Sequence, residues 1–272
     1  MDGERSKDNQ LKPREVGVPK ETPEQLFRET LETTRQAMNT LVGFAIENGA
    51  EPKKFSHIER VFAEDGHILL PSLKMIRDAL TKLHGETDMT RRTEVLTAQK
   101  TGEVFVPEEQ AGSVHDVFHE SIHRASWLHD REQGLGEKTA LKVKQLAECY
   151  GVQITPDGKI DPNSEYINKY TNNENEKAML VEYFTETLRK EVPRITEGLT
   201  EWATQRANGL VTKEGNKVIM EDSDFAYEDE VKYVNEIKVR MMQKEGITDE
   251  SADTKLITAA LTGDMGELTL YL

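Results

Sequence analysis

Two histidines four residues apart, with a glutamate directly after the first, are the residues of this chain best suited to metal chemistry: His119, Glu120 and His123. Residues four apart on a helix lie one above the other, with Cβ atoms about 5 to 6 Å apart. Two imidazoles so placed can bind one Zn²⁺ ion at about 2.0 to 2.1 Å. Glu120 lies at the edge of the same face and can accept a proton from a metal-bound water. The pentad predicts one catalytic zinc ion.

A catalytic zinc ion needs a third protein ligand and one open position, and two residues are candidates for the third ligand. His129 lies at the offset of the longer pattern HExxHxxGxxH, but Ser126 occupies the place of its turn-forming glycine. The other candidate is Glu197, on a helix expected to begin just after Pro193. Glu201 follows one turn later, so one carboxylate can bind the metal while the other accepts a hydrogen bond from a ligand imidazole. Both candidates remain open at this point.

A hydrolase also needs a hydrogen-bond donor for the developing oxyanion, and the candidates are Tyr227, Tyr233 and His129. The helical spacing of Tyr227 with Val231 and Val234 favours core packing instead. His115 precedes His119 by one turn, but helical drift argues against three ligands from one straight helix. We interpret His115 as a neighbour of the ligands, a cleft residue or an exposed side chain.

The segments HESIH at residues 119–123 and TEGLTEW at residues 196–202 resemble the gluzincins, the thermolysin-like zinc metallopeptidases in which a glutamate on a later helix completes HExxH. The resemblance covers mainly residues 94–202. It implies that His119, His123 and Glu197 bind zinc, that Glu120 is the general base and that Glu201 orients His119. It also implies that residues 103–106 form the edge strand that pairs with substrate. The interval from His123 to Glu197 is longer than in thermolysin, so we expect inserted helices there.

The elements around these residues indicate an α+β, zincin-like fold, with a small, mostly antiparallel sheet and an active-site helix followed by a mainly helical lobe. A capping box at Thr22 to Gln25 predicts a helix that ends at Gly49. We expect strands at 61–63, 67–70, 93–98 and 103–106, and a helix at 72–84 within the sheet. Helical spacing continues from Val114 through the histidines. Further helices are expected at 137–150, 175–190, 194–207, 227–244 and 252–261, with small hairpins at 156–158 and 214–216.

Length and composition restrict the class of protein. With 272 residues, the chain fits a polar, disordered tail at 1–21 and one catalytic domain at 22–272, with lobes of about 22–130 and 131–272. A formal net charge of -15 without a basic block argues against a nucleic-acid partner. The first residues carry no apolar segment, so we expect no signal, anchor or membrane partner. A single cysteine, Cys149, favours a reducing compartment, and we expect the cytoplasm.

Together these patterns predict a zinc metallopeptidase whose metal-activated water attacks a peptide or protein substrate. Two alternatives stay open: a zinc amidase acting on a non-protein substrate, and an interaction protein whose metal site is structural or vestigial. An open coordination position with a bound water would favour the enzymes, and a fourth protein ligand would favour a structural site. Sequence alone does not decide the substrate, the cleavage specificity or the oligomeric state.

Overall fold

The fold is described from a computed structural model, which describes residues 21–63, 65–72, 75, 95–98, 101–134, 141–213 and 227–272. The expected tail, nearly all of the helix at 72–84 and the hairpin at 214–216 lie outside these residues. The molecule combines many helices with a three-stranded sheet, so the fold class is α+β.

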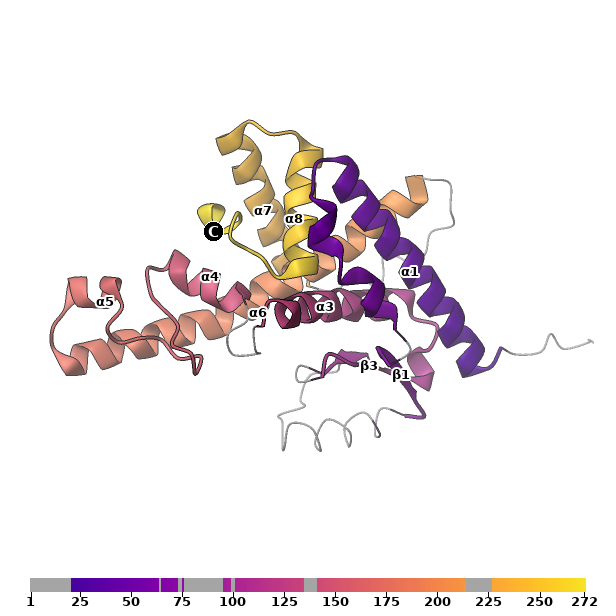
Figure 1. Ribbon diagram of the computed structural model, residues 1–272, viewed down its shortest axis with the longest axis horizontal. Coiled ribbons are helices and arrows are strands. Elements are labelled where there is room, and N and C mark those ends of the chain that lie inside the picture. Colours follow the sequence, from indigo (N-terminus) through magenta and orange to yellow (C-terminus); the bar gives the residue numbers. More distant parts are fainter. Residues whose placement is uncertain are drawn as a thin grey trace, which may run out of the picture.

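Helix α3 (Val114–Glu132) lies at the centre of the molecule, between the small sheet and the other helices (Figure 1). Ser113 caps its N-terminus by accepting the amide of Asp116, as polar residues at this position commonly do. One face of α3 packs on the sheet through Val117, and another joins the helical core through Phe118 and Ile122. The helix that carries the HExxH segment is therefore held from two sides.

Long helices form most of the remaining structure, and their bounds are α1 (Pro23–Glu47), α4 (Leu141–Cys149), α5 (Glu165–Tyr170), α6 (Glu174–Lys213), α7 (Glu228–Glu245) and α8 (Asp249–Thr262). Helix α1 begins with the predicted capping box, in which Thr22 and Gln25 satisfy each other's backbone amides. Short 3-10 turns complete the chain, among them η1 (Pro52–Phe55), η2 (Ile58–Phe62), η3 (Glu108–Gln110) and η6 (Thr269–Tyr271). The expected turn at 156–158 is present, closed by an antiparallel bridge between Ile154 and Ile160.

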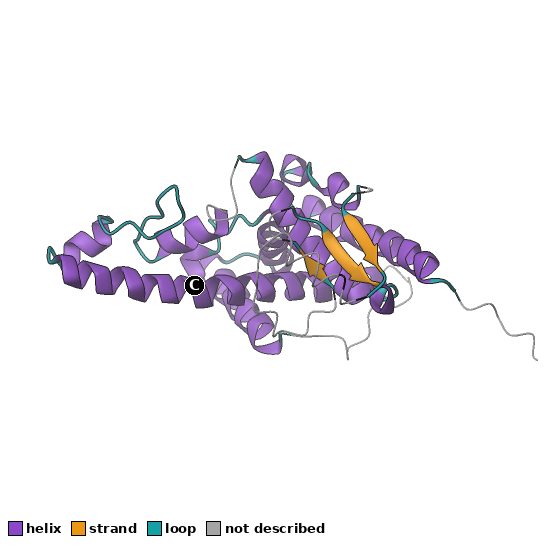
Figure 2. Ribbon diagram, turned by 90° about the horizontal axis from the view of Figure 1, so that it is seen from below, coloured by secondary structure: helices purple, strands orange, loops and turns teal. Residues whose placement is uncertain are grey.

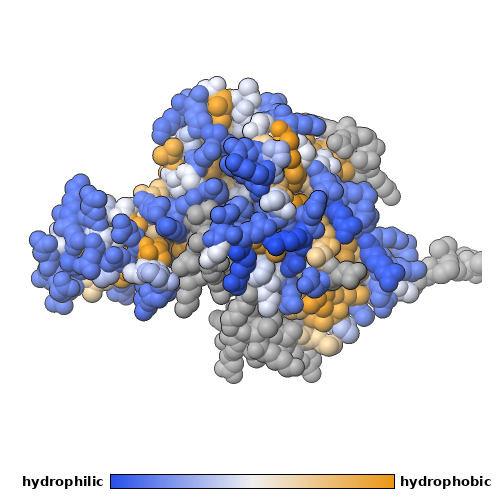
Figure 3. Space-filling view, viewed as in Figure 1, coloured by the Kyte–Doolittle hydropathy of each residue, from blue (hydrophilic) through white to orange (hydrophobic). Residues whose placement is uncertain are grey.

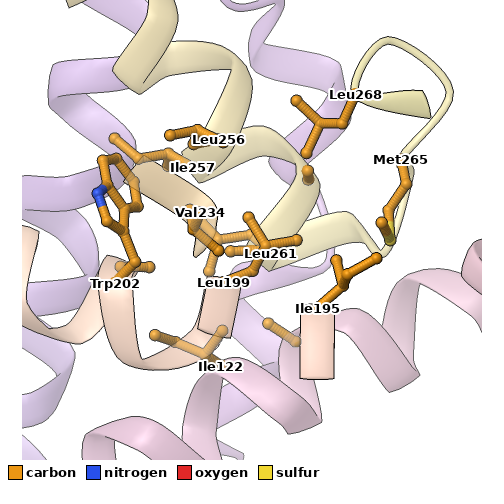
Figure 4. Packing of buried hydrophobic residues seen from close by; sticks show 14 of the residues in the cluster. Ile122, Ile195, Leu199, Trp202, Val234, Leu256, Ile257, Leu261, Met265 and Leu268 are labelled. Carbon is orange, nitrogen blue, oxygen red and sulfur yellow. The ribbon is translucent and has the colours of Figure 1, made fainter. Parts of the chain in front are cut away.

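The main hydrophobic core is formed where α3, α6, α7 and α8 meet (Figure 4). Ile122 of α3 lies close to Leu199 and Trp202 of α6, and α8 contributes Leu256 and Leu261. Burying each such side chain stabilises the fold by about 1.5 to 3 kcal/mol before entropy is counted. The core draws on residues from both sides of residue 130, so the HExxH helix and the helix that carries Glu197 are packed directly against each other.

Within the described residues, the sheet has three strands, β1 (His67–Leu70), β2 (Leu96–Thr97) and β3 (Val104–Pro107), in the order β1-β3-β2. Strand β3 pairs in parallel with β1 and antiparallel with β2. Two expectations were therefore wrong. The sheet is mixed and not mostly antiparallel, and the segment at 103–106 is its central strand and not an edge strand.

Two further local expectations were also wrong. Residues 61–63, expected as a strand, belong mainly to η2 and the bend after it, where Val61 is buried in the helical core. Pro193 was expected to separate two helices, yet it lies inside the continuous helix α6. An internal proline costs about 3 kcal/mol because it removes a hydrogen bond and crowds the preceding turn. Leu188 and Ile195, on either side of it, are both buried, so tertiary packing sustains the helix.

The strands gather at one end of the molecule, whereas α4, α5 and the first half of α6 extend to the other (Figure 2). The surface is mostly hydrophilic in the view of Figure 3, in keeping with the high content of charged residues. Among the described helices, none is both long and apolar enough to cross a membrane.

Candidate metal centre

His119 and His123 project from the same face of α3, as their spacing predicts. Their ring centroids are 5.0 Å apart, with an interplanar angle of 69°. The side chain of His119 is 7% exposed and that of His123 is 17% exposed, so His123 lies closer to solvent. Phe118 and Ile122, on the adjacent face, are fully buried and fix the rotation of the helix about its axis. The two imidazoles therefore face α6.

Glu197 of α6 meets both imidazoles with a single oxygen atom. Its Oε2 atom lies 3.2 Å from Nε2 of His119 and 3.2 Å from Nε2 of His123. Gly198 permits the close approach of α6 and α7 here, because a Cβ atom at this position would lie 2.7 Å from the carbonyl oxygen of Glu230. The predicted third ligand is thus brought to the histidines by helix packing.

The two distances from the Glu197 oxygen are close to those between neighbouring ligands of one metal ion. In a tetrahedral site with bonds of about 2.0 to 2.1 Å, neighbouring ligand atoms are about 3.3 Å apart. The two measured nitrogen-to-oxygen distances, both 3.2 Å, agree with this value. Two imidazole nitrogens and one carboxylate oxygen are also donors that Zn²⁺ prefers. The donor types of His119, His123 and Glu197 and the two distances from Glu197 suit a zinc ion.

Glu201, one turn after Glu197, forms a second layer behind His119. Its Oε2 atom lies 3.1 Å from Nδ1 of His119, and both of its oxygens lie 3.2 Å from Nε2 of His115. The Glu201 side chain is fully buried, and Gln205 also donates to it. An Nδ1–H of His119 that donates to Glu201 leaves the lone pair on Nε2, which is the atom directed at Glu197.

The opposite charges of the histidines and carboxylates in this cluster stabilise each other. Burial disfavours the charged form of His119, but the hydrogen bonds to Glu197 and Glu201 outweigh burial and raise its pKa to about 10. Burial likewise opposes the ionised form of Glu201, yet bonds from His115 and His119 lower its pKa to about 2. The pKa of Glu197 is also held well below its usual range, against burial, by its two histidines. Metal binding needs neutral imidazoles, so it releases protons from this cluster.

Glu120 lies beside the two histidines, and its carboxylate forms with them a group whose ligand atoms are within 4.8 Å of one another. Thr97 of β2 anchors this residue twice. The amide of Thr97 donates to the Glu120 carboxylate at 2.8 Å, and its hydroxyl donates to the Glu120 backbone carbonyl at 3.0 Å. The carboxylate is therefore oriented by the sheet and not by the imidazoles. Sequence reasoning missed Thr97, because nothing in the local pattern links it to α3.

Tyr227 does not pack in the core as its spacing suggested. It is the N-cap residue of α7, with φ of 59°, and its ring stacks on that of His119 at a centroid distance of 5.6 Å and an interplanar angle of 15°. Val231 and Val234, which follow it on α7, do enter the core. A non-glycine residue at positive φ is uncommon and requires support from its surroundings. The stacking on His119 places Tyr227 at the candidate centre.

His129 does not join the candidate centre. Helix α3 continues without a turn through Ser126 to Glu132, so His129 lies ten residues beyond His119 on one helix. Ten residues correspond to about 15 Å along a helix axis. The ring of His129 instead meets that of His57, with centroids 5.2 Å apart. Of the two candidates for the third ligand, only Glu197 lies at the meeting point of His119 and His123.

His115 proves to be part of the second layer and not an exposed side chain. It is 5% exposed, and it bridges Glu201 to Asp116, whose Oδ1 atom lies 3.0 Å from its Nδ1 atom. Burial opposes its charged form, but the bonds to these two carboxylates prevail and raise the pKa of His115 to about 9. The one-turn spacing before His119 was the signal for this role, although it did not identify Glu201 as the partner.

Comparison of the chain with protein-family models, with curated proteins and with solved structures finds no match. The geometry of the site offers three converging donors, a carboxylate beside them and a buried second layer. The side chains of His123 and Glu197 are 17% and 26% exposed, so water can reach the cluster.

Proposed function

We propose that this protein is a zinc-dependent hydrolase of peptide bonds, built on a zincin-like site. The observation that supports this function best is the pair of 3.2 Å distances from one Glu197 oxygen to Nε2 of His119 and of His123. Three ligands arranged in this way leave a fourth position of a tetrahedral ion for water or substrate. The resemblance of the two segments to gluzincins points to the same reaction class.

Zinc bound at this site would polarise the scissile carbonyl and bring the pKa of a bound water to about 7. Glu120 acts as the general base, taking a proton from the attacking water and passing it to the leaving nitrogen. The amide of Thr97 holds the Glu120 carboxylate beside the two histidines. Glu201 keeps His119 in the tautomer whose Nε2 atom is a ligand. Tyr227, stacked on His119, is the candidate donor to the developing oxyanion.

We place the substrate along β2 and not along β3, because only an edge strand can pair with an extended peptide. Strand β2 contacts α3 next to Glu120. The outward amide of Thr97 is held by the Glu120 carboxylate, so the peptide would pair with the remaining part of this edge. A peptide pairing there lies beside the base and the metal ligands.

The test is the replacement Glu120→Gln, with Glu182→Gln as a control on the exposed surface of α6. Zinc content of the purified proteins and hydrolysis of a mixed library of fluorogenic peptides are measured together. We expect Glu120→Gln to retain zinc and to lose peptide hydrolysis by about 10²- to 10⁴-fold, the usual contribution of a general base. Full activity in Glu120→Gln would refute the assigned role.

A second experiment compares two variants to test the identity of the third ligand. Glu197→Ala should lose the zinc ion of this site, whereas His129→Ala should keep hydrolysis. Loss of hydrolysis in His129→Ala alone would overturn the choice of Glu197. A zinc amidase acting on a non-protein substrate would show the same metal dependence but no turnover of peptides. A structural site would hold zinc with no exchangeable water, which the spectrum of the cobalt-substituted protein distinguishes.

A further inference from the structure

A second group of potential metal ligands lies at the C-terminal end of α3, formed by His57, His129 and Glu132. One ligand atom from each residue lies within 4.8 Å of those from the other two. His129 and Glu132 are three residues apart on α3, so they share one face of that helix. His57 comes from the segment between η1 and η2. The group thus joins elements that are far apart in the sequence, as the ligands of a metal site often do.

His57 is the strongest indication that this group binds a ligand. Its side chain is fully buried, and its Nε2 atom lies 3.0 Å from the backbone carbonyl of Leu261. Only an Nε2–H can donate to that carbonyl, so the neutral ring must carry its lone pair on Nδ1. Within the described part of the chain, this Nδ1 atom is buried and has no hydrogen-bond partner. A histidine whose other nitrogen donates to a backbone carbonyl is the arrangement found at metal ligands.

His129 adds a second buried ring nitrogen to the group. Its Nδ1 atom is also buried, again without a hydrogen-bond partner among the residues that the structure describes. The rings of His57 and His129 meet edge to face, with centroids 5.2 Å apart. A buried polar atom without a partner costs about 1 to 3 kcal/mol, and native proteins contain few of them. A metal ion between the two rings would give both nitrogens a partner.

Glu132 supplies the negative charge and the route to solvent. Its side chain is 31% exposed, and its Oε1 atom lies 2.7 Å from a guanidinium nitrogen of Arg60. A carboxylate has two oxygens, so it can hold Arg60 with one and a cation with the other. Because Glu132 is partly exposed, it can rotate to bring its oxygen from within 4.8 Å to the spacing of about 3.3 Å that a tetrahedral ion requires.

We propose that His57, His129 and Glu132 form a second site for a divalent transition-metal ion such as Zn²⁺. Two imidazole nitrogens and one carboxylate oxygen suit zinc and its neighbours, whereas calcium and magnesium prefer oxygen ligands throughout. The ion ties the segment around His57 to the end of α3 and, through the Leu261 carbonyl, to the end of α8. Its role is to stabilise the packing of these three elements.

This site is independent of the centre at His119 and His123. His129 lies about 15 Å along the helix axis from His119. The second site therefore does not depend on the proposed hydrolase function. The two sites can be emptied separately by substitution.

The experiment uses the full chain with His119→Ala and His123→Ala, which removes the first centre. Cobalt(II) is titrated into the apoprotein, and its visible absorption and the bound stoichiometry are measured. We expect one Co²⁺ ion per chain to remain. Adding His57→Gln should weaken its binding by more than about 100-fold, since even residues behind a ligand are worth about 10- to 100-fold. Glutamine at 57 can still donate to Leu261, which preserves the buried hydrogen bond.

His67→Gln in the same background is the matched control, because His67 is also a buried histidine with one Nε2 hydrogen bond and an unpartnered Nδ1 atom, yet it belongs to neither group of potential metal ligands among the described residues. It should retain the Co²⁺ ion. If His57→Gln does not fold, as judged by circular dichroism, His129→Ala replaces it with the same expected loss. The proposal is overturned if the folded background protein binds no Co²⁺, or if neither His57→Gln nor His129→Ala weakens the binding. Wild-type protein that binds one ion, lost on His57→Gln, would instead refute only the first centre.

Discussion

Replacing Glu201 with glutamine changes one buried carboxylate into an amide of nearly the same size. The two oxygens of Glu201 serve two histidines, His119 at 3.1 Å and His115 at 3.2 Å. An amide offers one accepting oxygen and one donating nitrogen. It can satisfy one of these histidines, and it must turn its NH₂ group toward the other. The substitution therefore removes the charge and one hydrogen bond without creating a cavity.

We expect Glu201→Gln to lower the affinity for zinc more than the stability of the fold. Partners behind a metal-ligating histidine are worth about 10- to 100-fold in affinity, which corresponds to about 1.4 to 2.7 kcal/mol. Glu201 is fully buried and supports His119 directly, so we expect a loss near the upper end of this range. The ligand atoms of His119, His123 and Glu197 remain in place, and the zinc stoichiometry at saturation should not change.

The assay is competition for zinc against a chromophoric chelator, at fixed pH, in variants with His57→Gln so that only the first centre is measured. Gln205→Ala is the control. Gln205 donates a hydrogen bond to Glu201, whereas Glu201 is the residue that bonds to His119. We expect its affinity to change far less. If Glu201→Gln binds zinc within twofold of its parent, Glu201 does not position a ligand, and the reasoning from the second layer is wrong.

Two further predictions concern stability. Gly198→Ala should destabilise the protein by about 1 to 3 kcal/mol, since the added Cβ atom would lie 2.7 Å from the Glu230 carbonyl oxygen and must push α6 from α7; equal unfolding midpoints in urea would contradict this. Burial lowers the pKa of His57 to about 4 and that of His67 to about 3, whereas a histidine in the unfolded chain has a pKa of about 6.5. The contribution of these two histidines to the free energy of unfolding is therefore complete above pH 6.5 and is lost as the pH falls toward their folded-state pKa values. When the pH is lowered from 7 to 5, the unfolding free energy of wild type should therefore fall by about 2 kcal/mol more than that of His67→Gln. Urea titrations that show an equal fall in both proteins would mean that His67 is not buried in its neutral form.

Much of the local structure could be predicted from the sequence, because it depends on neighbours in the chain. The capping box at Thr22 and the helical spacing through the HExxH segment both act within one or two turns, and α1 and α3 form where these signals lie. The same locality explains the pairing of β2 with β3, which are close to each other in the sequence. Where the local signal was overridden, as at Pro193, burial of residues on both sides of the proline sustains the helix.

The sequence by itself determined which residues could share one helical face: His119 and His123 on one helix, Glu197 and Glu201 on another. It left two candidates for the third ligand, because one-dimensional spacing cannot say which helices approach each other. Tertiary packing brought only one of them to the histidines, since a straight α3 carries His129 away while α6 crosses the histidines with Glu197. The strand order was decided in the same way, because a parallel partner such as β1 comes from a distant segment and leaves no local mark. Contacts between distant segments depend on the fit of whole surfaces, and only the folded molecule contains that information.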